Sequence, residues 1–502
     1  MRTLPLVGAC ASFSLAVAFA TPAIAKDAQT QELEQALEQF HKNPKQFMNT
    51  KPKKSSPIAH TKFQLKHESQ VQAHKHALRA RHHRVHPAGK EAPAFNDQAR
   101  NLVDKFELET LADIEAKKLT SAKLAETPWS DDYWAIYAGG ISKRYADPTI
   151  RTSENWKQNV DALKKAWTRP QTAAEIDKLS PSEKYDLLIG DTTRGLTMQQ
   201  LNEGQGYAKP DGSGVETWMG HCHGWSPAAY NVTRPKNKIV VKSADGKLDI
   251  PFYPSDIRAL STLLWANTNP TTKFIGGRCN TDKPPQDANG RITAAECRDV
   301  NPATWHKSVV NQIGVAKRSM VLDVTFDYQV WNQPFYSYKY TYFNPQTRKA
   351  AATLAAAKVK KGFAEDKFKA TRAAAATDLV GIQMKVKWVV ETQPSHAATN
   401  SPADDLTSGA TWLYTLELDK DGKIIGGEWM QNAHPDFLWT PPAGTHARAG
   451  QETTAVVASE TKWDAKGPIP AALKTTAAAA AKAGDPLGAI VEALAARSAA
   501  GH

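Results

Sequence analysis

The stretch from residue 218 to residue 230 reads Trp218-Met219-Gly220-His221-Cys222-His223-Gly224-Trp225-Ser226-Pro227-Ala228-Ala229-Tyr230. Glycines flank Cys222 on both sides, and a run of small residues that favours a helix follows. This pattern is typical of a cysteine nucleophile where a loop meets a helix, because free N–H groups at a helix N-terminus favour the thiolate and can hold an oxyanion. Glycine also permits close approach of a substrate carbonyl. The alternative is a buried, inert cysteine.

The N-terminus has the pattern of an export signal. Arg2 precedes an uncharged apolar stretch at 9–20, and Ala23-Ile24-Ala25 resembles a small-residue cleavage site. We therefore expect a signal peptide over 1–25, with a membrane anchor as the alternative. The mature protein is expected to be soluble and secreted or periplasmic, without membrane contact after cleavage.

Cleavage would remove one of the four cysteines and leave Cys222, Cys279 and Cys297. The simplest pairing in an oxidising compartment joins Cys279 to Cys297 across a loop rich in Pro, Asp, Asn and Gly. Such a bridge stabilises by about 3 kcal/mol. Cys222 is then left as a free thiol.

The 502 residues include 41% hydrophobic and 23% charged residues, which favours a multi-domain globular protein and excludes a fully disordered chain. The net charge of +12 is concentrated in 26–90, which carry +8. Residues 51–90 hold ten Lys+Arg, one acid and seven histidines. They indicate a solvated disordered arm, a removable propeptide or a polyanion-binding arm. The rest is near neutral, so no nucleic-acid partner is expected.

A cysteine nucleophile requires a separate histidine with an orienting acid or amide, and papain-like enzymes present Cys, His and Asp or Asn in that order along the chain. His306, in Asn301-Pro302-Ala303-Thr304-Trp305-His306, fits the second place. Asp323 and Asp327 follow on one face of a predicted strand at 320–328, so either can orient it. We prefer Asp323, because its apolar neighbours imply burial. His306 can also be a structural residue at a helix start. His221 and His223 are poor bases, because side chains adjacent to the thiol on such a turn point away from it.

Periodicity predicts the other elements. Helices are expected at 26–45, 97–125, from the Ser180-Pro181-Ser182-Glu183 capping box to about 202, from 254, at 349–377 and at 486–498. Strands are expected at 336–343, 382–391, 411–418 and 423–429, the last two joined by the hairpin signal Asp419-Lys420-Asp421-Gly422.

Several motifs, taken in order from about 127 to 442, are similar to the secreted transglutaminase elicitor family. They are Pro128-Trp129-Ser130, Gly139-Gly140 with Arg144-Tyr145-Ala146-Asp147, Leu179-Ser180-Pro181-Ser182-Glu183-Lys184-Tyr185-Asp186, Gly220-His221-Cys222-His223-Gly224-Trp225, Pro254-Ser255-Asp256-Ile257-Arg258-Ala259-Leu260, Val330-Trp331-Asn332-Gln333-Pro334 with Tyr338-Lys339, Gly426-Gly427-Glu428-Trp429 and His434-Pro435-Asp436-Phe437-Leu438-Trp439.

The resemblance implies an α+β fold with a papain-like catalytic core and additional helical domains. It implies a protein-glutamine γ-glutamyltransferase that joins glutamine and lysine of protein substrates through a thioester on Cys222, with His306 moving protons and Asp323 orienting it. Trp218, Trp225 and Trp305 are expected either to exclude water from the site or to pack in the core. The alternatives are a papain-like peptidase or glutamine deamidase, and a non-catalytic surface-binding protein.

The resemblance also implies calcium, whereas no organic cofactor is expected. The run from Glu417 to Glu428 fits much of an EF-hand loop, but it begins with Glu and is flanked by strand patterns, which favours a tight hairpin. A second possible oxygen cluster contains Asn280, Asp282, Asp287 and Asn289.

The predicted organisation has five segments. A signal peptide at 1–25 is followed by a basic arm or propeptide at 26–95, a helical domain at 96–215, a papain-like core at 216–445 and an Ala-rich peripheral tail at 446–502. Within the core, the Ala/Lys-rich stretch 349–377 is expected to be a helical insertion.

Overall fold

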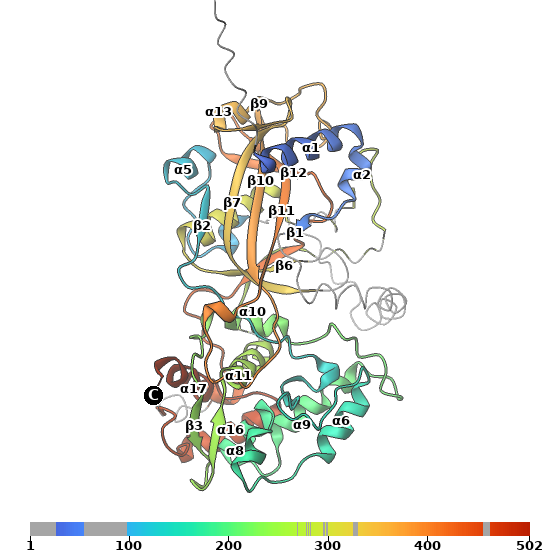
Figure 1. The fold of residues 1–502 in the computed structure, drawn as a ribbon. Helices are drawn as coiled ribbons and strands as arrows, with labels where there is room; N and C mark the ends of the chain where they lie inside the picture. Colours follow the sequence, from blue (N-terminus) through green and yellow to red (C-terminus); the bar gives the residue numbers. More distant parts are fainter. Residues whose placement is uncertain are drawn as a thin grey trace, which may run out of the picture.

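A long antiparallel sheet and a group of helices form two parts of the molecule, one above the other in Figure 1. The computed structural model describes residues 27–54, 98–268, 270–277, 279, 281, 283–294, 297, 300–324, 330–454 and 462–501. The expected α+β class is confirmed. The predicted signal peptide at 1–25 lies outside the described residues, as does most of the basic segment 51–90.

The sheet has the strand order β1-β11-β10-β7-β6-β13-β5, with β12 beside β11, β2 and β8 beside β7, and β9 beside β10. Its strands are β1 (Lys53–Lys54), β2 (Ser121–Lys123), β5 (Lys273–Gly276), β6 (Met320–Asp323), β7 (Asn332–Asn344), β8 (Lys349–Ala351), β9 (Val359–Lys360), β10 (Asp378–Val389), β11 (Thr407–Leu418), β12 (Ile424–Trp429) and β13 (Phe437–Thr440). The long strands β7, β10 and β11 form its centre, where Gln383 pairs with Thr341 on one side and Leu413 on the other. Their alternating aromatic and β-branched residues suit a pleated surface, as the sequence predicted.

The predicted hairpin between β11 and β12 is confirmed. Leu418 pairs with Ile424, and Gly422 adopts a φ of +80° in the turn between them. The Asp419 carboxylate accepts hydrogen bonds from the backbone N–H groups of Asp421 and Lys423, which closes the turn.

Helices dominate the second part, which also contains the hairpin of β3 (Ile239–Lys242) and β4 (Asp249–Phe252). The helices are α6 (Trp156–Lys165), α7 (Ala173–Asp177), α8 (Pro181–Ile189), α9 (Gly195–Asn202), α10 (Cys222–Asn231), α11 (Pro254–Asn267), α16 (Ala471–Ala483) and α17 (Gly488–Ala500). The predicted capping box of α8 is present, with Ser180 and Glu183 each accepting a backbone hydrogen bond from the other. Figure 1 shows α10 where the helices meet the sheet.

Other helices connect or cover the sheet. They are α1 (Ala28–Lys42), α2 (Pro44–Met48), α4 (Ala99–Leu102), α5 (Leu111–Ala116), α12 (Pro302–Val309), which continues as a π-helical segment at Val310–Val315, and α13 (Leu354–Ala357). The short helix α14 (Gly450–Thr454) packs against α16. The single helix predicted at 97–125 is divided into α4, α5 and β2.

The N-terminal residues before 55 are folded onto the sheet. Leu33, Leu37 and Phe40, predicted on one face of a helix, form that face in α1 and pack in a cluster with Phe343 and Leu413 of the sheet. Strand β1 adds to the edge of β11. The start of the predicted arm therefore contributes to the core.

The predicted helix at 349–377 is wrong except over Leu354–Ala357. Arg372, whose side chain is buried, donates to Asp366 at 3.0 Å and to Glu417 at 3.3 Å. Phe368 packs in the same cluster as α1. Burying this ion pair and this ring holds the segment in turns, and these tertiary contacts override the local helix propensity of Ala and Lys.

The C-terminal tail was expected to be peripheral, but its helices are buried in the main core. Leu473 in α16 and Ile490, Val491 and Leu494 in α17 are fully buried there. The helix predicted at 486–498 corresponds to α17. Within the described ranges, none of the helices combines the length and apolar composition that crossing a bilayer requires.

Candidate active site

Cys222 is the first residue of α10, and its side chain is buried. The glycines around it serve packing within the protein. A Cβ at Gly220 would lie 2.4 Å from the Tyr133 carbonyl oxygen, and one at Gly224 would lie 2.2 Å from the Thr262 carbonyl oxygen. The two glycines therefore let the start of α10 approach the residue 133 loop and α11, which fixes the position of the thiol.

Val330 and Asn332 contact the Cys222 sulfur. The thiol donates to the carbonyl oxygen of Val330 at 3.8 Å, and the Asn332 side-chain Nδ2 donates to Sγ at 3.7 Å. Asn332 begins β7, and its Oδ1 accepts a hydrogen bond of 2.8 Å from the Trp439 indole in β13. The indole thus determines which end of the Asn332 amide faces the thiol.

Burial raises the pKa of the Cys222 thiol to about 11. The nearby carboxylates of Glu391 and Asp323 raise it further, whereas hydrogen bonds from Asn332 lower it. At neutral pH the thiol is therefore protonated. Because the thiolate is the nucleophile, reaction requires that the proton leave the sulfur as the substrate is attacked.

The pH dependence of alkylation checks this electrostatic environment. Because burial raises the pKa of the thiol, the rate of Cys222 alkylation by iodoacetamide is expected to rise about tenfold per pH unit from pH 7 to pH 10. The alkylation rate of a small thiol with an ordinary pKa should level off near pH 9. Peptide mapping of the unreduced protein should find the label on Cys222, because Cys279 and Cys297 are bridged as predicted. A plateau at pH 9 or below would contradict the raised pKa.

Asp323 lies close enough to Cys222 for its charge to raise the pKa of the thiol. It is the last residue of β6, pairs with Asn332 of β7, and is fully buried. Its Oδ1 accepts a hydrogen bond of 3.0 Å from the backbone N–H of Trp331. Asp327, the alternative acid, lies outside the described residues.

His306 lies elsewhere, against the centre of the sheet. It is buried in α12, where its Nδ1 shares a hydrogen bond of 2.9 Å with the Tyr414 hydroxyl and its ring lies 4.8 Å from that of Tyr340. Tyr340 and the Cys222 neighbour Asn332 are both on β7, and the strand between them spans roughly 26 Å at about 3.3 Å per residue. The structure therefore does not bring His306 to Cys222.

Burial also lowers the pKa of His306 to about 3, with a smaller contribution from Lys307. Its imidazole is neutral at physiological pH. Asn301 caps α12, and two tyrosines surround the His306 ring. Both observations match the alternative interpretation of His306 as a structural residue near a helix start.

The histidines that flank Cys222 are held by other groups. Nε2 of His221 lies 3.0 Å from both carboxylate oxygens of Glu203. Burial lowers the pKa of His223 to about 4. Among the described residues, no imidazole hydrogen-bonds to the Cys222 sulfur.

Two of the tryptophans expected to exclude water pack in the core. Trp225 is fully buried and donates to the Trp129 carbonyl oxygen, and Trp305 is packed against Trp412. Trp218 donates to Glu216. The Trp439 ring reaches the site through its hydrogen bond to Asn332.

Sequence reasoning missed Asn332, Trp439 and Glu391 as site residues. Asn332 and Trp439 lie in two of the quoted motifs, but neither motif showed that their side chains meet at Cys222. Burial raises the pKa of Glu391 to about 7, and its Oε1 accepts a hydrogen bond of 2.6 Å from Gln333. Unlike Asp323, Glu391 was not identified from the sequence as a buried carboxyl near the thiol.

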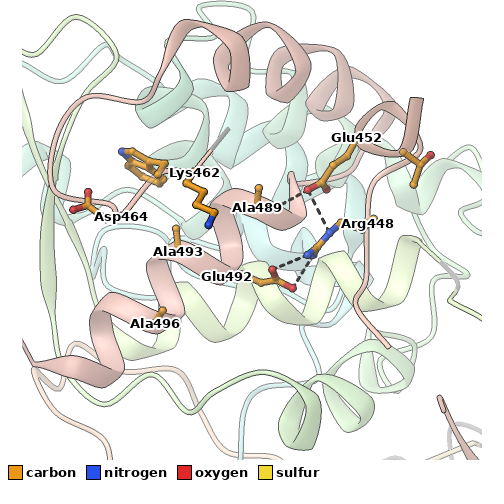
Figure 2. Close-up of a pocket in the computed structure, with 10 residues that line it drawn as sticks. Arg448, Glu452, Lys462, Asp464, Ala489, Glu492, Ala493 and Ala496 are labelled. Atoms are coloured by element: carbon orange, nitrogen blue, oxygen red, sulfur yellow. Dashed lines mark hydrogen bonds and ion pairs between the residues drawn. The ribbon is translucent and has the colours of Figure 1, made fainter. Parts of the chain in front are cut away.

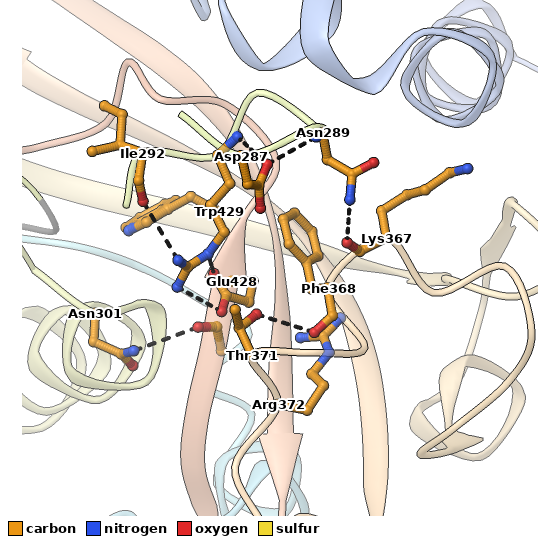
Figure 3. Close-up of polar contacts among 12 residues, drawn as sticks. Asp287, Asn289, Ile292, Asn301, Lys367, Phe368, Thr371, Arg372, Glu428 and Trp429 are labelled. Carbon is orange, nitrogen blue, oxygen red and sulfur yellow. Dashed lines mark hydrogen bonds and ion pairs between the residues drawn. The ribbon is translucent and has the colours of Figure 1, made fainter. Parts of the chain in front are cut away.

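Other groups already engage the acidic side chains that the EF-hand pattern would use: Asp419 accepts from backbone N–H groups of its own turn, and arginines pair with Glu417 and Glu428. Glu417 accepts from Arg372, and Glu428 accepts from Arg291 at 2.7 and 2.9 Å; Figure 3 shows Glu428 and Arg372 among these polar contacts. In the second proposed cluster, Asn280 and Asp282 lie outside the described residues, and Asp287 accepts from backbone N–H groups of its own loop. No group of three or more His, Cys, Asp or Glu side chains in the described ranges is arranged to hold a metal.

A pocket of about 960 Å³ next to α14 and α17 contains none of these site residues (Figure 2). Three of its charged side chains, Arg448, Glu452 and Glu492, pair with one another. Arg448 donates to Glu492 at 2.7 and 2.8 Å, and Glu452 accepts from the backbone N–H groups of Gly488 and Ala489 at the start of α17. These contacts cap a helix and tie the C-terminal segments together.

Comparisons with known proteins find a family model and a solved structure that resemble this chain. A family model described as Transglutaminase elicitor matches residues 99–459. The chain is similar to the crystal structure of the GP42 transglutaminase from Phytophthora sojae, with 25% sequence identity, a TM-score of 0.44, and coverage of 68% of this chain and 89% of that one. A search of curated proteins finds no significant match.

Proposed function

This chain belongs to the transglutaminase elicitor family, and from that membership we propose that it transfers the acyl group of protein glutamine to lysine amines. The observation that supports this proposal is the position of Cys222. It is a free thiol at the N-terminus of α10, next to a side-chain amide that can stabilise developing negative charge.

The proposed reaction has two steps. Sγ of Cys222 attacks the carbonyl carbon of a glutamine carboxamide, the carbon–nitrogen bond breaks, and ammonia leaves with the thiol proton. A lysine amine then attacks the resulting thioester, its proton returns to the sulfur, and an isopeptide bond remains. Atoms balance without a cofactor in either step.

Burial of the thiol supports transfer to an amine rather than to water. A water-poor site limits hydrolysis of the thioester, which would convert glutamine to glutamate. The side chain of Cys222 is buried, and Tyr133 and Trp331 pack against each other nearby with ring centres 5.6 Å apart.

We keep the papain-like fold in the proposal, but not the complete triad of Cys222, His306 and Asp323. A helix that begins with the nucleophile and contacts an antiparallel sheet supports it. Asp323, whose charge acts on the thiol, is retained as a site residue. The proton-transfer role expected of His306 is not carried forward, because its ring contacts Tyr340 and Tyr414 instead.

We further propose that the protein acts outside the cytoplasm on proteins that carry glutamine and lysine. The Cys279–Cys297 disulfide supports an oxidising compartment.

The direct test incubates the protein with a glutamine-containing peptide and a biotinylated primary amine, and measures ammonia and incorporated amine separately. We expect both in equal amounts. Ammonia without incorporation would identify a deamidase, new peptide termini a peptidase, and neither product a binding protein. The assay is repeated with and without calcium, because family resemblance implies that ion.

A further inference from the structure

A small pocket of about 240 Å³ adjoins Cys222 through Asn332. Its walls include Pro227 of α10, Trp265 of α11, and the aromatic residues Phe274 of β5 and Trp439 of β13. Phe274 and Trp439 pair across the two strands, and Phe274 is 52% exposed. The pocket thus leads from the surface, past aromatic rings, to the amide that touches the nucleophile.

The lining of this pocket carries no formal charge. None of its residues is Asp, Glu, Lys or Arg, and burial lowers the pKa of His223, which also lines it, to about 4. A lysine ammonium would enter without a counter-charge, and burying an unpaired charge is costly. A glutamine side chain has apolar methylenes and a neutral carboxamide, so it suits such a pocket.

Asn332 offers the hydrogen bond that a carboxamide oxygen needs. Its Oδ1 is occupied by the Trp439 indole at 2.8 Å, so its Nδ2 points to the thiol at 3.7 Å. A donor fixed in this way can follow the oxygen as it becomes negative, which stabilises the transition state.

We propose that this pocket holds the glutamine side chain of the acyl donor, with Asn332 donating to its carboxamide oxygen and Trp439 positioning Asn332. The inference rests on the proposed transglutaminase function. As the sulfur–carbon bond forms, the carbonyl electron pair moves to the oxygen that Asn332 contacts. The pair returns when the carbon–nitrogen bond breaks and ammonia leaves with the thiol proton.

Steady-state kinetics with the glutamine and the amine varied separately test the assignment. Asn332→Ala should lower kcat by about 100-fold. Trp439→Phe keeps the aromatic wall but loses the indole donor, so it should lower kcat by about tenfold and change the glutamine KM by less than about twofold. The matched control is Trp412→Phe, which removes a buried indole hydrogen bond to Ala433 elsewhere in the sheet and should leave both constants unchanged.

Binding is measured independently of turnover. Excess glutamine peptide should protect Cys222 of the wild-type protein from iodoacetamide, and Phe274→Ala should weaken this protection by about tenfold, because it removes an apolar wall. Phe274 is half exposed, so this variant should fold.

Absence of protection in the wild type would overturn the inference, whether or not amine is transferred. For Phe274→Ala, a raised amine KM with an unchanged glutamine KM would also overturn it, because the pocket would then hold the acceptor. Protection without incorporation would instead uphold the pocket and contradict the proposed transfer.

Discussion

Replacing Cys222 with alanine is expected to reduce amine incorporation by at least about 10,000-fold, because the described residues contain no other free thiol that could form the thioester. The remaining cysteines of the described chain, Cys279 and Cys297, are bridged to each other. Ammonia release should disappear together with incorporation, since both products depend on the same acyl transfer. The measurement is the two-product assay, with the unfolding midpoint determined in parallel.

A matched control separates loss of chemistry from loss of structure. Ser226→Ala changes a buried small side chain one turn further along α10 and should keep wild-type activity. Cys222→Ala should keep a free energy of unfolding within about 1–2 kcal/mol of the wild type, since only one buried sulfur is removed. Incorporation by Cys222→Ala at more than a few per cent of the wild-type rate would contradict a thioester on this residue.

Local signals predicted much of the secondary structure. The alternation in β10 and β11, the hairpin at Asp419–Gly422 and the capping box at Ser180 each depend on residues close together in the sequence. The disulfide followed from counting cysteines and from the turn residues between them. Such features need no knowledge of the tertiary structure.

The wrong predictions concern features that are determined by contacts between residues far apart in the sequence. Ala and Lys predicted a helix over 349–377, but Arg372 reaches two buried acids, one of them on β11, and holds the segment in turns. For the site, the order of Cys, His and Asp along the chain suggested a triad. That order contains no information about the length of β7, which separates His306 from Cys222.

Two of the motifs that indicated the family are joined by a buried ion pair. Lys184 of α8 donates to Asp256 of α11 at 2.7 Å, and both side chains are completely buried. Asp256 also accepts hydrogen bonds from the Tyr145 hydroxyl at 2.9 Å and from the backbone N–H of Tyr253 at 2.8 Å. One carboxylate therefore links three segments, and α11 packs directly against α10, which carries the nucleophile.

Lys184→Met is consequently expected to lower the free energy of unfolding by about 3–5 kcal/mol, because it leaves the carboxylate of Asp256 buried without its cation. Lys184→Met combined with Asp256→Asn should recover part of this loss, since no unpaired charge remains. Lys157→Met is the matched control. Lys157 pairs with Asp161 at 2.9 Å, but both side chains are exposed, so the change should stay within about 0.5 kcal/mol.

Urea unfolding followed by far-ultraviolet circular dichroism measures all three variants under the same conditions. The buried pair and the exposed pair have nearly equal lengths, so a difference between Lys184→Met and Lys157→Met isolates the effect of burial. Equal and small losses would mean that water reaches Asp256 once the lysine is removed. In that case the link between α8 and α11 would depend on apolar packing, and the ion pair would serve to select the arrangement of the two helices.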